Sequence, residues 1–319
     1  MARVFVTRSL PGDALGRLAA EHEADVWPDR LPPPADELCA RASSAEGLLS
    51  LLTDRVDAGL IAACPHLRAI SNYAVGVDNV DLEAATERGI PVGNTPGVLT
   101  ESTADLAVAL MLGIARRLAE GDGFVRAGEW VTWEPGLLLG HDLHQSTVGI
   151  VGFGRIGQAV ACRLEGFGCE LLHTSRSGGV PLEELLDRSD FVTLHCPLTP
   201  DTRGLIGDEA LGRMKPTAYL VNTARGPIVD TDALERALRG GEIAGAALDV
   251  TDPEPLPGDH RLLEAPNLLV IPHLGSATHA TRERMAAMAV DNLLAGLAGE
   301  RMPNCANPEV YEAATRPEP

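Results

Sequence analysis

The sequence feature that most constrains the fold is a glycine-rich turn, Gly152-Phe-Gly154-Arg-Ile-Gly157, between an apolar run and a helical run. The run Val148–Val151 predicts a strand, and Arg155–Gly166 has the spacing of a helix. In such a turn the first glycine permits the bend, the second lets a ligand approach the backbone, and the third lets helix and strand pack closely. The helix N-terminus adds free N–H groups, and Arg155 adds a positive charge. The pattern therefore predicts a dinucleotide site on a parallel sheet.

Short apolar runs alternate with helical patterns along most of the chain, which is typical of parallel sheets covered by helices. The other expected strands are Arg3–Thr7, Ala24–Trp27, Gly47–Leu51, Leu67–Asn72, Pro91–Gly93, Glu170–Thr174, Phe191–Cys196, Ala218–Thr223, Ala244–Asp249 and Leu268–Pro272. The other expected helices are Asp13–Glu21, Ala35–Arg41, Ala58–Ala63, Leu82–Arg88, Glu101–Leu118, Leu182–Arg188 and Thr281–Leu297. The stretch Gly121–Gln145 is less regular and contains several glycines.

The chain of 319 residues is long enough for two cores of domain size. We predict an α/β fold with two doubly wound parallel-sheet domains, one flavodoxin-like and one Rossmann, and a cleft between them. Residues 1–99 with 285–319 form the expected substrate domain, and residues 100–284 form the expected dinucleotide domain. We expect the active site in the cleft and a hinge near residues 98–101 and 281–290.

Composition excludes several classes of function. A net charge of −19 argues against nonspecific binding to nucleic acid, which is itself a polyanion. No apolar run is long enough for a membrane span, and the N-terminal sequence lacks a signal-peptide pattern. The six cysteines are scattered, without the spacing of a zinc site, so we expect no metal and reduced thiols in a cytoplasmic protein.

The second strand after the glycine turn indicates which dinucleotide binds. NAD sites usually place an acid there to hold the ribose 2′-hydroxyl. Here the strand ends in Ser175-Arg176-Ser177, which offers hydroxyls and a guanidinium. One charge interaction at about 4 Å is of order 1–4 kcal/mol near a surface. We therefore expect a preference for NADP(H) of tenfold or more, with NAD(H) as the alternative cofactor. The other interpretation of Arg176 is a solvated surface side chain.

Three residues of the right chemistry follow predicted strands at the edge where open α/β sheets bind ligands. Arg225 can bind a carboxylate in bidentate fashion and polarise the adjacent carbonyl. His273 can donate a proton to an oxygen as hydride arrives at its carbon. Glu254, in the proline-bracketed loop Asp252–Pro257, can orient His273 and favour its charged form. Each residue alone has an ordinary structural explanation, but the set predicts reduction of an oxo acid.

The chain resembles the D-2-hydroxyacid dehydrogenases over nearly its whole length, and most closely their glyoxylate/hydroxypyruvate reductase branch. The matching strings are Asn72-Tyr-Ala-Val-Gly-Val-Asp-Asn79, Asn94-Thr-Pro-Gly-Val-Leu-Thr100, GFGRIGQAVA at 152–161, VNTARGPIVD at 221–230, LDVTDPEPLP at 248–257 and PHLGSATH at 272–279. The segment after Ser177 is shorter than the family usually has, with only Gly178–Pro181 before the next helix.

The resemblance implies roles for particular residues. The family's catalytic arginine, glutamate and histidine fall on Arg225, Glu254 and His273. Its carboxylate-binding backbone falls on Val75 and Gly76. The implied cofactor-contacting residues are Thr103, Gly152, Phe153, Gly154, Arg155, Ile156, Gly157, Ser175, Arg176, Ser177, Cys196, Pro197, Thr223, Ala224, Asp249, His273, Gly275 and Ser276.

The resemblance also implies a homodimer in which Trp133 reaches the neighbouring subunit's substrate site. The other interpretation of Trp133 is burial in its own subunit.

We therefore expect an oxidoreductase that transfers a hydride from NADPH to C2 of a small 2-oxo acid, preferably glyoxylate or hydroxypyruvate. The alternatives are an NAD-dependent dehydrogenase for D-lactate, 3-phosphoglycerate or phosphite, and a nucleotide-sensing corepressor-like binding protein. A phosphorylated substrate would require further cations, and the first domain offers Arg8, Arg55 and Arg68.

Overall fold

The structure, a computed structural model, describes residues 1–313 and forms two compact units. Of the described residues, unit 1 comprises 1–99 and 278–313, and unit 2 comprises Thr100–Ala277. The return to unit 1 was expected at residue 285, but it falls at Thr278. The reason lies in helix α11 (His279–Ala298), whose first turn is already tied to unit 1 by a hydrogen bond of 2.8 Å from Tyr73 Oη to Arg282 O.

Unit 1 has a five-stranded parallel sheet with the strand order β2-β1-β3-β4-β5. The strands are β1 (Arg3–Val6), β2 (Glu23–Val26), β3 (Gly47–Ser50), β4 (Ala69–Asn72) and β5 (Val92–Gly93). The helices are α1 (Ala14–Glu21), α2 (Ala35–Ala42), α3 (Ala58–Ala63), α4 (Leu82–Glu87), α11 and α12 (Val310–Ala313). Successive residues of β1 enter different cores: Val4 and Val6 pack with α1 and α11, whereas Phe5 packs with α2, α3 and α4. This is the layering expected of a buried parallel sheet.

Unit 2 has a seven-stranded sheet with the order β12-β11-β10-β9-β6-β7-β8, parallel except for β8. The strands are β6 (Thr147–Val151), β7 (Glu170–Ser175), β8 (Gly178–Gly179), β9 (Phe191–Leu194), β10 (Tyr219–Asn222), β11 (Gly245–Leu248) and β12 (Leu268–Val270). The helices are α5 (Thr100–Ala115), α6 (Leu118–Arg126), α7 (Arg155–Glu165), α8 (Leu182–Arg188), α9 (Asp208–Arg213) and α10 (Thr231–Gly240), with 3-10 turns η1 (Gly226–Ile228) and η2 (Arg261–Glu264).

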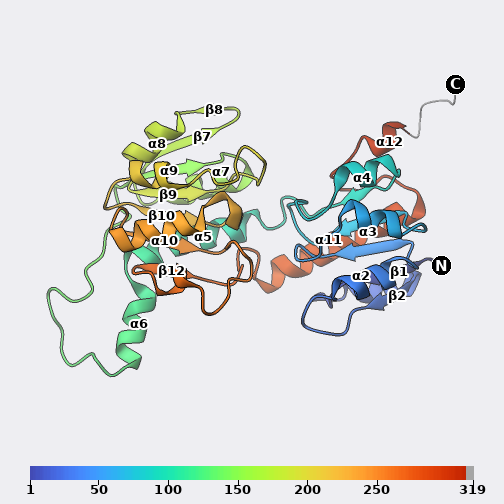
Figure 1. Cartoon of the computed structure of the whole chain (residues 1–319), viewed down its shortest axis with the longest axis horizontal. Coiled ribbons are helices and arrows are strands. Elements are labelled where there is room, and N and C mark those ends of the chain that lie inside the picture. The colour runs from blue at the N-terminus through green and yellow to red at the C-terminus, as the bar shows by residue number, and fades with distance from the viewer. Residues whose placement is uncertain (314–319) are drawn as a thin grey trace. The chain divides into compact units, whose positions relative to one another are not determined.

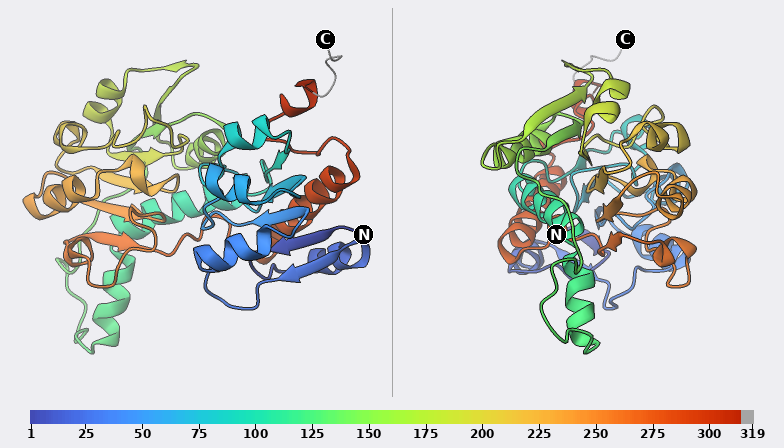
Figure 2. Two further views of the ribbon diagram at one scale, coloured as in Figure 1. Left: turned by 45° about the vertical axis from the view of Figure 1, so that its right-hand side comes forward. Right: turned by 90° about the vertical axis from the view of Figure 1, so that its left-hand side faces the viewer.

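The strand order of unit 2 reverses between β6 and β9, and α5 with α7 covers one face while α8, α9 and α10 cover the other (Figures 1 and 2). Open α/β sheets bind ligands where the order reverses, at the carboxyl ends of the strands. The predicted α/β fold with two doubly wound sheets is confirmed. None of the helices within residues 1–313 is long and apolar enough to cross a membrane.

Two local predictions are wrong. The helix expected to continue to Leu118 ends at Ala115, because Arg117 adopts a left-handed conformation with φ 53°. The stretch from Gly121, expected to be irregular, begins inside helix α6. Its two glycines disfavour a helix, but the ion pairs Arg117–Glu120 and Arg126–Asp122 support it.

Candidate active site

The glycine turn between β6 and α7 has the geometry of a phosphate cradle. Gly152 has φ 94°, and a Cβ there would lie 2.4 Å from the backbone N of Cys196. A Cβ on Gly157 would lie 2.2 Å from Gly152 O, whereas one on Gly154 would meet no atom within 4 Å. The turn therefore needs glycine at both ends and leaves open space at its middle, beside the N-terminus of α7, whose N-cap Gly154 has no side chain to cap it. These residues fit the pyrophosphate of a dinucleotide.

The other residues of this turn are divided between surface and core. Arg155 is exposed, while Phe153 and Ile156 are partly buried and pack against the core beneath α5 and α7. The Phe153 ring stacks on His173 of β7, with ring centroids 4.0 Å apart. The sequence prediction missed His173, although its position near the end of β7 could have revealed it.

The segment after β7 forms a tight hairpin. Strand β8 pairs antiparallel with β7, with Ser175 opposite Gly178, so that Arg176 and Ser177 form the turn. Ser175 Oγ lies 3.0 Å from Ser177 Oγ and 3.0 Å from Gly178 O. Arg176 is exposed at the tip. The short segment after Ser177 thus completes the sheet edge with a two-residue strand.

The ends of β9 and β10 enclose a histidine that the sequence analysis did not select. His195 Nε2 lies 2.9 Å from Thr193 Oγ1, and its Nδ1 lies 3.4 Å from Thr223 Oγ1. Burial lowers the pKa of His195 to about 4, so the ring is neutral at neutral pH. The adjacent Cys196 is half-buried, and burial raises the pKa of its thiol. The rule that function gathers at strand ends could have found His195, since it precedes the expected Cys196 and Pro197.

Arg225 lies in a loop that the side chain of Asn222 closes. Asn222 Nδ2 donates to Arg225 O at 2.9 Å, and its Oδ1 accepts from Ala224 N at 3.0 Å. The loop also contacts the chain after β11, because a Cβ on Gly226 would lie 1.9 Å from Thr251 O. Arg225 is therefore fixed by its neighbours on two strands.

The structure brings the predicted histidine and glutamate together. His273 Nδ1 lies 2.6 Å from Glu254 Oε1, and the two side chains are 27% and 32% exposed. Because Nδ1 faces the carboxylate, Nε2 is the ring nitrogen left for a substrate. His273 adopts φ 52°, and its backbone N donates to Asp249 O at 2.9 Å. A left-handed histidine next to a carboxylate is a constrained arrangement that is common at functional sites.

Asp249 and Thr103 hold the loop that follows His273. The Asp249 carboxylate accepts hydrogen bonds from Leu274 N at 2.5 Å and Gly275 N at 2.9 Å, and Thr103 Oγ1 donates to Gly275 O at 3.1 Å. Burial raises the pKa of Asp249, and these two N–H donors oppose the rise. Both side chains are buried, and the expected residue Ser276 is half-buried next to them.

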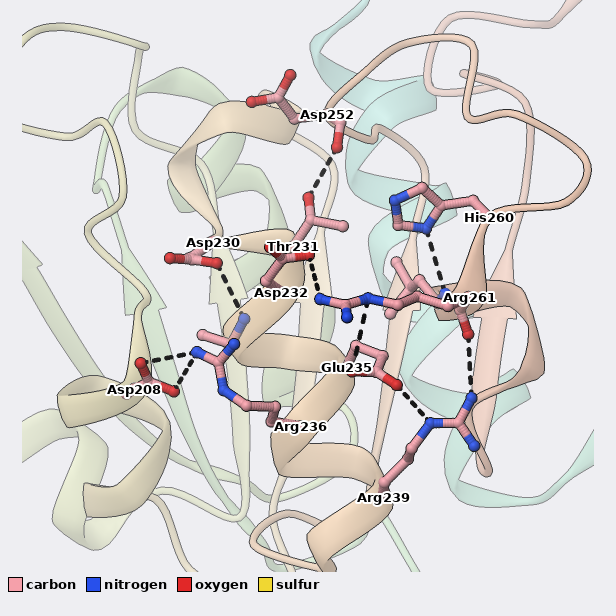
Figure 3. Close-up of polar contacts among 12 residues, drawn as sticks. Asp208, Asp230, Thr231, Asp232, Glu235, Arg236, Arg239, Asp252, His260 and Arg261 are labelled. Carbon is pink, nitrogen blue, oxygen red and sulfur yellow. Dashed lines mark hydrogen bonds and ion pairs between the residues drawn. The ribbon is translucent and has the colours of Figure 1, made fainter.

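The loop that carries Glu254 is braced on helix α10 (Figure 3). Before Glu254, Thr231 Oγ1 donates to Asp252 O at 2.8 Å. After it, Arg261 pairs with Asp232 at 2.7 Å, and His260 Nδ1 accepts from Leu262 N at 3.2 Å. The ion pair is exposed and weak by itself, but together with the Thr231 bond it attaches both ends of the loop to one helix.

Helix α6 and the loop after it project from the body of unit 2 (Figure 1). No residue of α6 is buried. Trp133 is 77% exposed, so the interpretation that it is buried in its own subunit is wrong. The large exposed apolar residues of this arm are Leu118, Val125, Trp130, Val131, Trp133 and Leu139. Such a concentration of exposed apolar side chains is typical of an interaction surface.

In unit 1, Val75 and Gly76 are half-buried in the loop after β4. Among residues 1–313, no group of three His, Cys, Asp or Glu side chains could hold a metal ion.

A dinucleotide turn at a topological switch point, with an arginine, a histidine and a glutamate on neighbouring strand ends, defines a nicotinamide-dependent oxidoreductase. Comparison with known proteins identifies the family. Residues 108–275 match the family model for D-isomer specific 2-hydroxyacid dehydrogenase, NAD binding domain. The chain belongs to the D-isomer specific 2-hydroxyacid dehydrogenases, as its sequence predicted.

Relatives cover nearly the whole chain. A glyoxylate reductase from Korarchaeum cryptofilum is 50% identical, with 97% of both chains covered, and one from Thermococcus litoralis is 46% identical, with 98% of both covered. The crystal structure of the TT0316 protein from Thermus thermophilus is 52% identical, has a TM-score of 0.91, and covers 95% of this chain and 99% of its own. An NADPH-dependent glyoxylate/hydroxypyruvate reductase from Sinorhizobium meliloti, in complex with NADP and malonate, is 33% identical with a TM-score of 0.83, and 96% and 97% of the chains are covered.

Proposed function

We propose that this protein reduces glyoxylate, and with a lower kcat/KM hydroxypyruvate, to the corresponding 2-hydroxy acid. NADPH is the hydride donor in this proposal. The observation that carries the proposal is the 2.6 Å contact between His273 and Glu254, on a sheet edge that also holds Arg225 and the dinucleotide turn. The names of the glyoxylate reductases among the relatives support the choice of substrate.

In this proposal each site residue has a separate role in the reaction. The bound nicotinamide supplies the hydride that forms the new C–H bond at C2. Arg225 binds the substrate carboxylate and polarises the carbonyl. His273 gives the proton from Nε2 to the carbonyl oxygen, so that the two-electron reduction ends with a neutral hydroxyl. Glu254 orients the ring and stabilises it while it is protonated, and the backbone N–H groups at Val75 and Gly76 bind the carboxylate.

The hairpin tip supports NADPH as the donor. Ser175, Arg176 and Ser177 offer hydroxyls and a positive charge where a 2′-phosphate would lie, and the tip contains no acid. NADH lacks the phosphate that Arg176 would bind, so it is the poorer donor in this proposal. The complex of a relative with NADP is consistent with this preference.

Unit 1 favours a small substrate without a phosphate. Arg55 pairs with Asp57 at 2.9 Å and Arg68 pairs with Glu46 at 3.0 Å, so both candidate cations already have acid partners. Arg8 donates to Thr7 O and to Thr53 Oγ1. A phosphorylated oxo acid would have to compete for these groups.

The proposal includes a homodimer. The exposed apolar arm would be covered by a second copy, and Trp133 would take part in the partner's substrate site. The six free cysteines fit a reducing compartment such as the cytoplasm.

The test is steady-state turnover with NADPH and with NADH against glyoxylate, hydroxypyruvate, pyruvate, phosphohydroxypyruvate and, in the oxidative direction, phosphite. The highest kcat/KM is expected for NADPH with glyoxylate. A higher kcat/KM for a phosphorylated acid or for phosphite would identify that compound as the substrate in place of glyoxylate. Dinucleotide binding without any turnover would favour a nucleotide-sensing role. Sedimentation of the intact protein checks the dimer.

A further inference from the structure

Three successive carbonyl groups in the loop after β4 are held by the protein. Ala74 O accepts from Thr95 N at 2.8 Å. Val75 O accepts from the side chain of Asn94, at 2.8 Å from Nδ2. Gly76 O accepts from the side chain of Asn72, at 3.0 Å from Nδ2. The last two bonds come from side chains that the sequence analysis named only as parts of matching strings.

The direction of these carbonyls fixes the direction of the amides. In a planar trans peptide, the N–H of the following residue points opposite to the carbonyl. Because the carbonyls of residues 74, 75 and 76 point toward Thr95, Asn94 and Asn72, the N–H groups of Val75, Gly76 and Val77 point the other way. None of these three N–H groups donates a hydrogen bond within residues 1–313, and all three residues are half-buried. Successive free amides of this kind bind anions.

Asn72 is itself held rigidly. It is fully buried, and its Oδ1 accepts from Ser50 Oγ at 3.0 Å. Its Nδ2 also donates to Asn79 Oδ1 at 2.9 Å, and Asn79 Nδ2 donates to Asp54 O at 2.9 Å and to Leu51 O at 3.0 Å. The ends of β3 and β4 are thereby joined through neutral side chains.

Asn94 is held from the other side. Its backbone O accepts from Asn292 Nδ2 of helix α11 at 2.8 Å. Asn292 has no freedom to move toward β5, because a Cβ on Gly93 would lie 2.7 Å from Asn292 Cβ. A rigid donor can orient a peptide more effectively than a mobile one, since less side-chain entropy is lost.

We propose that Asn94 and Asn72 are positioning residues that aim the N–H groups of Gly76 and Val77 at the carboxylate of the 2-oxo acid, beside the Val75 N–H whose peptide is held by Thr95 N. The inference rests on the proposed function for the identity of the anion. In this proposal the two asparagines act only through the peptides that they hold, without contact to the substrate or the reacting atoms. They fix two peptide planes, and the amide dipoles attract the carboxylate without any titrating group.

The experiment compares Asn94→Leu with Asn304→Leu. Leucine has nearly the shape of asparagine but cannot donate to Val75 O. Asn304 is a half-buried asparagine of the same unit, and its contact with Asn292 uses only its backbone N. For Asn94→Leu we expect the KM for glyoxylate to rise about tenfold, the effect of one lost hydrogen bond, with kcat changed less than about threefold. The KM for NADPH should not change, and Asn304→Leu should match wild type throughout.

Binding of oxalate, a planar dicarboxylate that cannot be reduced, gives a second measurement. Calorimetry in the presence of NADP should show about tenfold weaker oxalate binding for Asn94→Leu than for wild type. An unchanged KM and oxalate affinity in a folded Asn94→Leu protein would overturn the inference, as would an equal loss in Asn304→Leu or a fall in kcat alone. If Asn94→Leu does not fold, Asn94→Ser is measured in the same way. Failure of wild type to reduce any oxo acid would instead reject the proposed function, and the oxalate titration would still test the asparagines.

Discussion

The two sheets of this molecule carry different candidate functional groups at their carboxyl edges. At the carboxyl edge of the unit 2 sheet lie ionisable side chains, Arg225, Glu254 and His273. At the corresponding edge of unit 1 lie neutral amides, Asn72 and Asn94, that hold backbone carbonyls. The first set can move protons and stabilise charge, whereas the second can only bind. In the proposed function, the chemistry is therefore assigned to unit 2 and part of the recognition to unit 1.

The largest expected effect comes from removing the proton donor of unit 2. His273→Asn keeps a polar side chain but cannot act as a general acid at neutral pH, so kcat for glyoxylate should fall at least about 10²-fold. The KM for NADPH should stay close to wild type, since the glycine turn is untouched. Steady-state kinetics check both values. His273→Asn should thus lower kcat, whereas Asn94→Leu should raise the KM for glyoxylate and leave kcat nearly unchanged. A near-normal kcat for His273→Asn would contradict the catalytic role assigned to the unit 2 edge.

A second test asks whether backbone geometry also matters in unit 2. In Gly226→Ala the new Cβ would lie 1.9 Å from Thr251 O, so the loop with Arg225 must separate from the chain that leads to Glu254. Misplacement of this kind should lower kcat/KM about 10- to 100-fold.

The matched control for Gly226→Ala is Gly258→Ala, where a Cβ meets nothing within 4 Å. This control should keep wild-type kinetics. Equal kinetics for the two variants would show that Arg225 does not depend on the contact with Thr251.

The comparison between the edges also explains what the sequence could predict. The unit 2 edge was predicted because Arg225, Glu254 and His273 have distinctive chemistry and follow apolar strands. Strand alternation and the glycine turn were equally visible, so the fold class followed from them.

The unit 1 edge could not be predicted in the same detail. Asparagine is common in turns, and the sequence does not show that Asn94 faces Val75 O. The same holds for Asn222, which closes the Arg225 loop from three residues away. Helix α6 was missed for a related reason, since its support comes from ion pairs and not from an apolar face.

A third test uses pH, because only the unit 2 edge contains a desolvated histidine. His195 has a pKa of about 4 in the folded protein, against about 6.5 for an unfolded histidine. As the pH falls, the unfolded chain binds the proton first, so stability from neutral His195 is complete above pH 7 and is lost between about 6.5 and 4.

At pH 5 this loss is about 2 kcal/mol, which is about 30-fold in the unfolding constant. The His195→Gln variant has no imidazole to protonate at this position. The urea concentration at the midpoint of its unfolding should therefore decline less than that of wild type between pH 7.5 and pH 5. Parallel declines would mean that His195 is solvated in the folded protein.

A smaller effect is expected at the hairpin tip, where unit 2 meets the cofactor in the proposed function. Arg176→Ala should lower the ratio of kcat/KM for NADPH to that for NADH about tenfold, because one surface charge interaction is lost. Arg213→Ala removes another exposed arginine of unit 2, paired with Asp187, and should leave the ratio unchanged. If both variants keep the wild-type ratio, Arg176 is a solvated side chain.

The smallest expected effect concerns the brace between α10 and the Glu254 loop. Thr231→Val removes the hydroxyl that donates to Asp252 O, and a single such bond contributes about 1 kcal/mol. The far end of the loop stays tied through Arg261 and Asp232, so only part of this energy reaches Glu254, and kcat should fall about threefold while the KM for glyoxylate is unchanged. Thr231→Ser keeps the hydroxyl and should restore kcat. A rise in KM instead would mean that the brace serves binding, and the chemical role assigned to the unit 2 edge would then have to include recognition as well.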